Sequence, residues 1–229
     1  MTSPQLIPAS DHSVLVSFGN EISLEHHRSV VRLTQLLLAE RSAFVRNVNP
    51  AYCSVLVSFN PNIVAFHDVE AYLKATVQKI ESVPLPPSRT VEILVCYGGK
   101  FGPDLADVAA HNHITIEDVL RLHSSGEYLV YFLGFSPGFP FIGGMSEKIA
   151  TPRLAAPRTK VPAGSVAIGG KQTGIYPVSS PGGWRLIGRT PLRLFNPRNE
   201  PPTLLQMGDV VRFKPIARDE FDSLINQSD

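Results

Sequence analysis

Two arginines in the middle of this sequence are placed to bind an anion. Arg153 and Arg158 each follow a proline, and Lys160 comes two residues after the second pair. A proline fixes its own backbone φ angle and so limits the directions open to the arginine beside it. A guanidinium group held in this way suits bidentate contacts with a carboxylate or a phosphate. We expect Arg153 and Arg158 to act in catalysis; the alternative is that they form salt bridges that hold a long loop.

These arginines lie in a segment rich in glycine and positive charge. Residues 131–189 contain eleven of the 17 glycines of the chain. Residues 146–200 contain nine Lys or Arg residues and two acidic ones, a local charge of +7 in a chain of net charge +1. Apolar residues recur throughout the segment, which argues against disorder. Clustered cations on loops favour an anionic ligand, and a solvated basic face is the alternative.

Further polar residues in this segment suit a small ligand with an amide or an acid group. Gln172 follows the Gly169–Gly170 pair and could hydrogen-bond an amide. The turn before Trp184 offers free backbone amides that could form an anion-binding nest, although Trp184 could equally plug a barrel. We expect Gln172 to act in catalysis. The residues expected to bind substrate or anion are Lys160, Thr173, Tyr176, Ser180, Gly182, Gly183, Trp184 and Arg189.

One histidine completes the candidate site, and several familiar motifs are missing. His123 ends a short predicted helix, where it could shuttle a proton or simply cap the helix. The sequence contains no GxxxxGK[ST], GxSxG or HExxH motif and no Cys/His cluster, so we expect no metal site. The polar groups therefore resemble half of an active site, and we expect the chain to be inactive alone.

The first 87 residues predict a small α+β domain. Strands are expected at 13–18, 43–48 and 52–59, and helices from a Ser23 cap to about Glu40 and from Phe66 to Ile80. This βαββα order would become ferredoxin-like with one more strand. The proline-rich stretch 82–88 predicts a linker, with the domain boundary near Pro87.

Residues 88–218 predict a mainly-β domain. A strand at 90–97 precedes two short helices, one beginning near Pro103 and one capped by Thr115 with Asp118. Short strands follow at 128–134, 164–170, 174–178, 184–189, 191–195 and 209–215, separated by Gly/Pro turns. This pattern is typical of a closed or nearly closed β-barrel with two helices packed on it. Residues 219–229 are expected to form a helical or frayed tail.

Composition bounds the compartment and the partners. The near-neutral charge and the lack of a Lys/Arg block argue against a nucleic-acid partner. No apolar run approaches the roughly 20 residues needed to cross a bilayer, and the first residues lack the pattern of a signal peptide. Cys53 and Cys96 lie in apolar runs and are expected to be free thiols. We therefore expect a cytoplasmic protein without a membrane segment.

The motifs themselves resemble a known family. The runs GFSPGFPFIGG, VPAGSVAIGGKQTGIYP and SPGGWRLIGRTP, with the two Pro-Arg pairs, closely resemble the B subunit of 5-oxoprolinase. Its relatives are a sporulation histidine-kinase inhibitor and the allophanate hydrolase subunit 1 domain found in urea carboxylase. The resemblance implies a cyclophilin-like barrel, in agreement with the strand pattern.

The resemblance also implies an activity and partners. It implies one subunit of an ATP-dependent 5-oxoprolinase, which works with the A and C subunits to convert 5-oxo-L-proline to L-glutamate; the C subunit resembles allophanate hydrolase subunit 2. ATP would be shared with the partner, because phosphorylating the oxygen of an unstrained lactam makes it easier to hydrolyse. Two alternatives remain open: a non-enzymatic inhibitor of a sensor histidine kinase, and a carboxyltransferase-like part of a urea or amide carboxylase.

The aromatic loop is the expected partner surface. The run GFSPGFPFIGG is interrupted by prolines and glycines, so it is not expected to form a strand buried along its length. Phe139, Phe141 and Ile142 should then either pack into the barrel or remain partly exposed for another chain, and a large exposed apolar patch usually marks a binding site. We expect these three residues to contact the C subunit.

Overall fold

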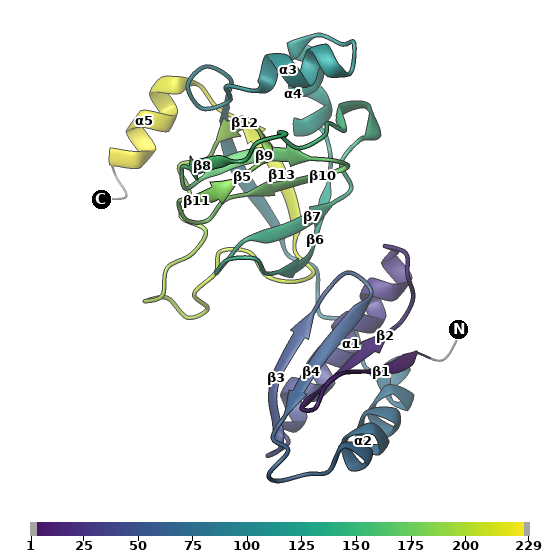
Figure 1. Ribbon diagram of the computed structural model, residues 1–229. Helices are drawn as coiled ribbons and strands as arrows, with labels where there is room; N and C mark the ends of the chain where they lie inside the picture. Colours follow the sequence, from purple (N-terminus) through teal and green to yellow (C-terminus); the bar gives the residue numbers. More distant parts are fainter. Residues whose placement is uncertain (1–3, 227–229) are drawn as a thin grey trace. The chain divides into compact units, whose positions relative to one another are not determined.

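The computed structural model describes residues 4–226 (Figure 1). The described chain divides between Pro87 and Ser88 into two compact units. The described residues include no helix that is both long enough and apolar enough to cross a membrane.

The N-terminal unit is a four-stranded antiparallel sheet with two helices. The sheet has the order β1-β2-β4-β3. Its elements are β1 (Gln5–Ser10), β2 (Ser13–Ser17), α1 (Leu24–Glu40), β3 (Val45–Pro50), β4 (Ser54–Phe59), α2 (Phe66–Gln78) and the 3-10 turn η1 (Ile80–Ser82). Buried Val14, Val16, Val55 and Val57 alternate with more exposed residues along the two central strands, so one face of the sheet is buried.

Sequence patterns predict this unit well at its helices and less well at its edges. Ser23 caps α1 as predicted, accepting a hydrogen bond from the His26 amide at 3.1 Å. The predicted βαββα order is present. The fourth strand, β1, precedes that core and pairs with β2, so the ferredoxin-like arrangement with a last strand is not confirmed.

The second unit contains a closed barrel of seven strands, in the order β10-β7-β6-β13-β5-β12-β9. The strands are β5 (Thr90–Tyr97), β6 (Tyr128–Leu133), β7 (Pro140–Gly143), β9 (Ser165–Gly169), β10 (Gln172–Ile175), β12 (Arg185–Arg189) and β13 (Val210–Pro215). The predicted closed barrel is thus confirmed. Neighbouring pairs are antiparallel except β13 and β5, which run parallel from Val210 opposite Thr90 to Pro215 opposite Val95.

Three helices pack on this barrel. Helices α3 (Leu105–His111) and α4 (Ile116–Ser124) lie together at one end in Figure 1, and the C-terminal α5 (Arg218–Asn226) lies to one side. The predicted capping box of Thr115 and Asp118 is present. Helix α3 begins two residues later than predicted, because Asp104 makes tertiary contacts instead of lying in the first turn. Phe221 of α5 is buried against Phe101, so the predicted tail is a packed helix as far as Asn226; residues 227–229 lie outside the described part.

A separate two-stranded ribbon lies outside the barrel. It joins β8 (Arg158–Val161) to β11 (Ser180–Gly182), with Gly182 opposite Arg158 and a register shift between Ser180 and Gly182. Strand β8 was not predicted from the sequence. The predicted strand at 191–195 was wrong: this stretch is irregular and makes only an isolated bridge, Phe195 with Thr203.

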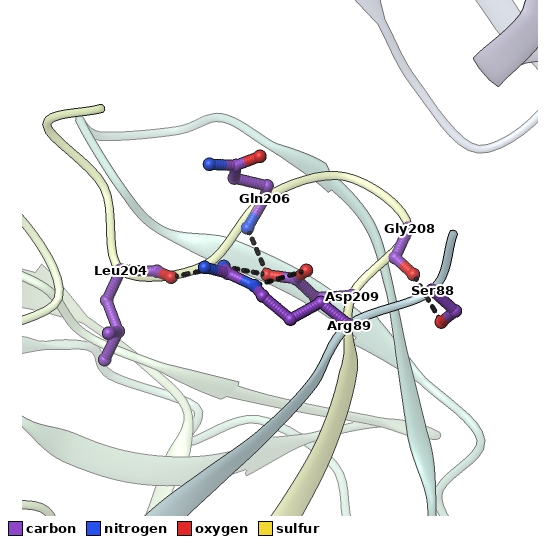
Figure 2. Close-up of polar contacts among 6 residues, drawn as sticks. All are labelled: Ser88, Arg89, Leu204, Gln206, Gly208 and Asp209. Carbon is purple, nitrogen blue, oxygen red and sulfur yellow. Dashed lines mark hydrogen bonds and ion pairs between the residues drawn. The ribbon is translucent and has the colours of Figure 1, made fainter. Parts of the chain in front are cut away.

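A polar clamp ties the beginning of the barrel unit to the strand that closes it (Figure 2). The guanidinium group of Arg89 donates to both carboxylate oxygens of Asp209, at 3.1 and 2.6 Å, and to the carbonyl of Leu204 at 2.7 Å. The backbone amide of Gln206 also donates to Asp209, at 2.7 Å. The side chain of Asp209 is 6% exposed and that of Arg89 is 51% exposed. The clamp thus holds β5 and β13 in register through a buried carboxylate.

Breaking this clamp from either side should destabilise the barrel more than breaking an exposed ion pair. We expect Asp209→Ala to lower the free energy of unfolding by roughly 2–4 kcal/mol, since the charged hydrogen bonds from Arg89 and the bond from the Gln206 amide are lost. Arg89→Ala should cost a similar amount, because it leaves the buried carboxylate of Asp209 without its charged partner. Urea unfolding followed by the fluorescence of Trp184, the single tryptophan, measures the barrel unit. Arg212→Ala, which breaks the exposed pair with Glu127, is the matched control and should cost less than about 0.5 kcal/mol. Equal losses for all three variants would contradict a special role for the clamp.

Candidate functional site

A second apolar cluster lies on the outer face of the barrel. Along β9, Val166 and Ile168 belong to the barrel interior, whereas Ala167 between them belongs to the outer group. This outer cluster consists of Phe139, Val161, Ala167, Tyr176, Trp184 and Leu186. The ribbon of β8 and β11 covers part of it, because Val161 of β8 is fully buried within it.

Two glycines allow the aromatic rings of the outer cluster to approach the backbone. A Cβ atom on Gly169 would lie 2.5 Å from the ring of Trp184, and one on Gly182 would lie 2.3 Å from the Tyr176 hydroxyl. Real Cβ atoms do not approach so closely, so both positions need glycine. Trp184 therefore packs against the outside of the barrel wall, and the alternative that it plugs the barrel is wrong.

The two predicted arginines lie at the edge of this cluster. The exposed Arg153 places its guanidinium carbon 5.6 Å from the centre of the Trp184 ring, in a cation–π contact. Arg158 is half-buried and donates from Nη2 to Oδ1 of Asp104 at 2.7 Å. Both arginines lie close enough to Tyr176 to favour its ionised form, although burial has the larger effect and raises the pKa of Tyr176. The structure thus brings Arg153, Arg158, Tyr176 and Trp184 together.

Asp104 connects this group to the barrel. Its side chain is 6% exposed, and its second oxygen, Oδ2, accepts from the backbone amide of Leu186 at 2.7 Å. Its own amide donates to the Leu186 carbonyl at 3.0 Å. Asp104 is therefore fixed on both sides, by strand β12 and by Arg158.

Two polar atoms of this region are enclosed without a partner. Within residues 4–226, neither Nη1 of Arg158 nor Oγ of Ser180 has a hydrogen-bond partner, and both atoms are shielded from solvent. Such orphaned groups are rare in proteins because each costs free energy. The ribbon strands thus carry an unused donor and an unused hydroxyl, the chemistry that an anionic or amide ligand would satisfy.

Other predicted ligand residues lie near this group. The carbonyl of Gly183 accepts from the Leu154 amide at 2.7 Å, which connects the 153–158 loop to the turn before Trp184. Gln172 lies opposite Gly169 in the β9–β10 pair, and residues directly opposite share a face of the sheet. Gln172 is thus on the outer face, the same face as Trp184.

His123 and Thr173 lie apart from this group, inside the barrel. His123 is fully buried, with its ring 4.4 Å from that of Phe213. The Thr173 hydroxyl donates to the Ala167 carbonyl at 3.1 Å, so it must accept from Nε2–H of His123 at 2.9 Å. Nδ1 then accepts from the Tyr97 hydroxyl at 2.7 Å.

This network gives His123 a structural setting rather than the predicted catalytic one. Burial lowers the pKa of His123 to about 3, so its ring is neutral. Both ring nitrogens are already used and no part of the ring is exposed, so a proton shuttle to a ligand at the outer face has no direct path. Sequence reasoning located the residue on the correct helix but could not show that the last turn of α4 directs it into the core.

Of two further predicted anion-binding residues, one lies on the ribbon and the other lies elsewhere on the surface. Lys160 is exposed on β8. Arg189 donates from Nε to the Ala163 carbonyl at 2.8 Å, and its guanidinium carbon lies 5.9 Å from the centre of the Phe101 ring. Lys100 and Arg218 contact the same ring. Arg189 thus belongs to a different basic group, beside α5.

The aromatic loop differs from its prediction. Phe139 and Ile142 are buried, so the expectation that they are exposed to a partner is wrong. The stretch 140–143 forms strand β7 despite its proline and glycine, and its alternation directs Ile142 into the barrel. Phe141 stacks on Phe132 with ring centres 4.3 Å apart.

The exposed residue of this loop is Phe135. Its side chain is 70% exposed and its φ angle is +67°, a conformation that residues other than glycine rarely adopt. Phe135 lines a shallow groove of about 430 Å³, together with Ser136, Phe195 and Thr203. The Ser136 hydroxyl is buried and has no partner within residues 4–226. Strain and an exposed aromatic side chain at one loop are typical of a functional surface.

Sequence reasoning missed Asp104 and Phe135. Asp104 precedes a helix, which made it look like an ordinary acid of the first turn; its partner Arg158 lies 54 residues later. The positive φ angle of Phe135 could not be predicted, because phenylalanine has no preference for this backbone conformation. Among the described residues, no group of three His, Cys, Asp or Glu side chains could hold a metal ion.

The chain belongs to the family described as "Carboxyltransferase domain, subdomain C and D", which matches residues 4–205. Within it, the chain is 42% identical over 240 residues to the B subunit of 5-oxoprolinase from Bacillus subtilis (strain 168), covering 98% of both chains. The resemblance to the family of 5-oxoprolinase B subunits is thereby confirmed.

Two solved structures are similar to this chain. The protein TTHA0988 is 36% identical, with a TM-score of 0.79; the match covers 90% of this chain and 40% of that one. The urea carboxylase of Kluyveromyces lactis is 22% identical with a TM-score of 0.79, covering 98% of this chain and 23% of that one. At this lower identity the likeness shows a shared fold.

The buried His123 should make the stability of the barrel unit depend on pH. Because the folded pKa of about 3 lies below the ordinary value of 6.5, the unfolded chain binds the proton first as the pH falls. Stability should therefore decrease from about pH 6.5 downwards, by up to roughly 1.4 kcal/mol per pH unit from His123. Urea unfolding of His123→Gln, followed by Trp184 fluorescence, should show a flatter dependence between about pH 6.5 and 4.5.

Comparing variants isolates this effect from other titrating groups. The exposed His111 offers the control, and His111→Gln should keep the slope of the natural sequence. An unchanged slope in His123→Gln would mean that His123 is protonated in the folded barrel, against the neutral network described above.

Proposed function

We propose that this chain is the B subunit of an ATP-dependent 5-oxoprolinase, which converts 5-oxo-L-proline to L-glutamate together with the A and C subunits. The observation that carries the proposal is the 42% identity over 98% of both chains with a relative of that name. The cytoplasm is the proposed compartment, and both cysteines are free thiols, as expected in a reducing environment. The barrel that carries the site would be a member of the cyclophilin-like class.

The outer cluster supplies the proposed substrate contacts. Arg153 and Arg158 would bind the acid group of the substrate, and Gln172, Tyr176 and Ser180 would face its lactam. The support is that these side chains lie on or beside one outer face of the barrel, whereas His123 and Thr173 are enclosed within it. All five of these substrate contacts are groups that bind a ligand, and none of them is placed to act as a nucleophile. This supports an active site that a partner subunit completes.

The same residues do not fit the triphosphate of ATP. Arg153 and Arg158 bring two positive charges and Asp104 brings one negative charge, so the group has a single net positive charge. A triphosphate carries several negative charges and is usually held by backbone nests, lysines and metal ions. We therefore assign ATP binding to the partner side of the complex.

The loop around Phe135 is the proposed contact with the C subunit. The groove beside it is shallow, and Phe135 projects from a strained backbone. In TTHA0988 the region matched by this chain is 40% of a longer chain, so in that relative the matching region is joined to a further segment. An exposed aromatic anchor beside a groove is the usual centre of a binding surface.

The activity should require the complex and the arginines. This chain alone should release no phosphate from ATP with 5-oxoproline, and co-expression with the A and C subunits should give 5-oxoproline-dependent phosphate release. Arg153→Ala should lower that activity at least about tenfold, because a charged hydrogen bond to the substrate is lost. The melting temperature should change by only a few degrees, since Arg153 is exposed. Full activity with a much lower melting temperature would identify Arg153 as a structural brace, and turnover by the lone chain would contradict the incomplete site.

The partner surface can be tested at one residue. Phe135→Asp should abolish co-purification with the C subunit while leaving the circular dichroism spectrum unchanged, because the replaced ring is mostly exposed. Ile63→Asp is the matched control: Ile63 is also exposed, at 61%, but lies in the other unit and should not affect binding. Unchanged affinity of Phe135→Asp for the C subunit would place the interface elsewhere.

A further inference from the structure

Arg158 is held by a residue that no sequence motif marks. Asp104 accepts from Arg158 Nη2 at 2.7 Å through Oδ1 and from the Leu186 amide at 2.7 Å through Oδ2. One carboxylate oxygen is bound to the barrel wall, and the other holds the Nη2 arm of the guanidinium group through a charged hydrogen bond. Nη1, on the other arm of the fork, is unpaired within residues 4–226.

The unpaired arm belongs to a polar enclosure at the ribbon. Arg158 pairs with Gly182 across the ribbon, so the two share a face, and the missing Cβ of Gly182 would lie 2.3 Å from the Tyr176 hydroxyl. Ser180, with its own unpaired hydroxyl, lies on the same ribbon strand as Gly182. The underside of the ribbon thus gathers unused hydrogen-bonding groups beside the otherwise apolar outer cluster.

The charge of this enclosure selects the kind of ligand. With Arg153 and Arg158 opposed by Asp104, the group offers one unit of positive charge, which matches one carboxylate better than a phosphate. Trp184 and Tyr176 provide an apolar wall beside it. A small cyclic acid, with a single carboxylate and an apolar ring, has the matching chemistry.

We infer that Asp104 is a positioning residue that presents Nη1 of Arg158 to the carboxylate of a small cyclic acid bound beneath the β8–β11 ribbon. The inference rests on the proposed function in naming that acid as 5-oxoproline. Since Nη1 is shielded from solvent, the ribbon must move for the ligand to enter. The ribbon strands have four and three residues with a register shift between Ser180 and Gly182, and isolated two-stranded ribbons are only marginally stable.

The single tryptophan of the chain provides a direct binding assay. Trp184 lies in the outer cluster under Arg153, so its fluorescence should change when 5-oxoproline is titrated into the chain alone. 5-Oxoprolinamide keeps the lactam and lacks the carboxylate, and it should bind at least about tenfold more weakly, as expected when a charged hydrogen bond is lost. Inorganic phosphate should not compete. Equal binding of the acid and the amide, or competition by phosphate, would overturn the assignment of a carboxylate.

Substitutions test the role of Asp104. Arg158→Lys keeps the charge and loses the fork, and it should weaken 5-oxoproline binding at least about tenfold. Asp104→Asn should weaken binding to a similar degree. The double variant should bind no more weakly than Arg158→Lys alone, because Asp104 acts through Arg158. Asp107→Asn, one turn along α3, breaks the pair with Arg185 and should leave binding unchanged. Additive losses in the double variant would mean that Asp104 only supports the fold.

Kinetic measurements on the assembled complex distinguish a failure of this inference from a failure of the proposed function. In the active complex, Arg158→Lys and Asp104→Asn should raise KM for 5-oxoproline at least about tenfold and leave KM for ATP unchanged. An active complex with unchanged KM in both variants would overturn the inference and leave the function standing. A complex without activity, with Arg158-dependent binding of the acid to this chain, would overturn the function and leave the site standing. If Asp104→Asn does not fold, Asp104→Glu and Arg158→Lys give the same comparison.

Discussion

The parallel pairing of β5 with β13 is the constraint on which the barrel depends. The two strands begin and end the barrel, with 120 residues from Arg89 to Asp209, and every other barrel strand lies between them in sequence. Loop closure over such a distance is entropically costly, so the ends need strong local contacts. The buried carboxylate of Asp209 provides them at one end of the pair, and Phe221 of α5, packed on Phe101 near Cys96, covers the other.

Closure of the barrel divides neighbouring residues between two environments. Successive side chains of a strand point to opposite faces, so Thr173 enters the core with His123 while Gln172 and Gly174 face outward. The outward residues of β9, β10 and β12 would leave an apolar face in water. Trp184, Phe139 and the ribbon cover that face, and the charged groups collect at its margin. The candidate site thus results from covering the outside of a barrel.

Elements whose signals are local could be predicted from the sequence. The caps at Ser23 and Thr115 and the strand 90–97 follow directly from residue type and alternation. The ribbon strand β8 escaped because it is short, rich in charge and paired with a segment of glycine and proline. Partners distant in sequence, such as Asp104 with Arg158, have no local signal. The arginines themselves could be selected from the sequence, because proline pairs and basic charge are local features.

Nη1 of Arg158, which is unpaired among the described residues, lowers the stability of the fold. A buried N–H without an acceptor destabilises the fold, by about 1–3 kcal/mol for a neutral group and more for a charged one. An apolar residue at position 158 would avoid that cost, but would leave the carboxylate of Asp104 buried and unpaired. The two residues therefore form a unit in which the fold tolerates one unsatisfied arm. A ligand acceptor that satisfies this arm gains the free energy that the empty site lacks, so part of the binding energy is already stored in the fold.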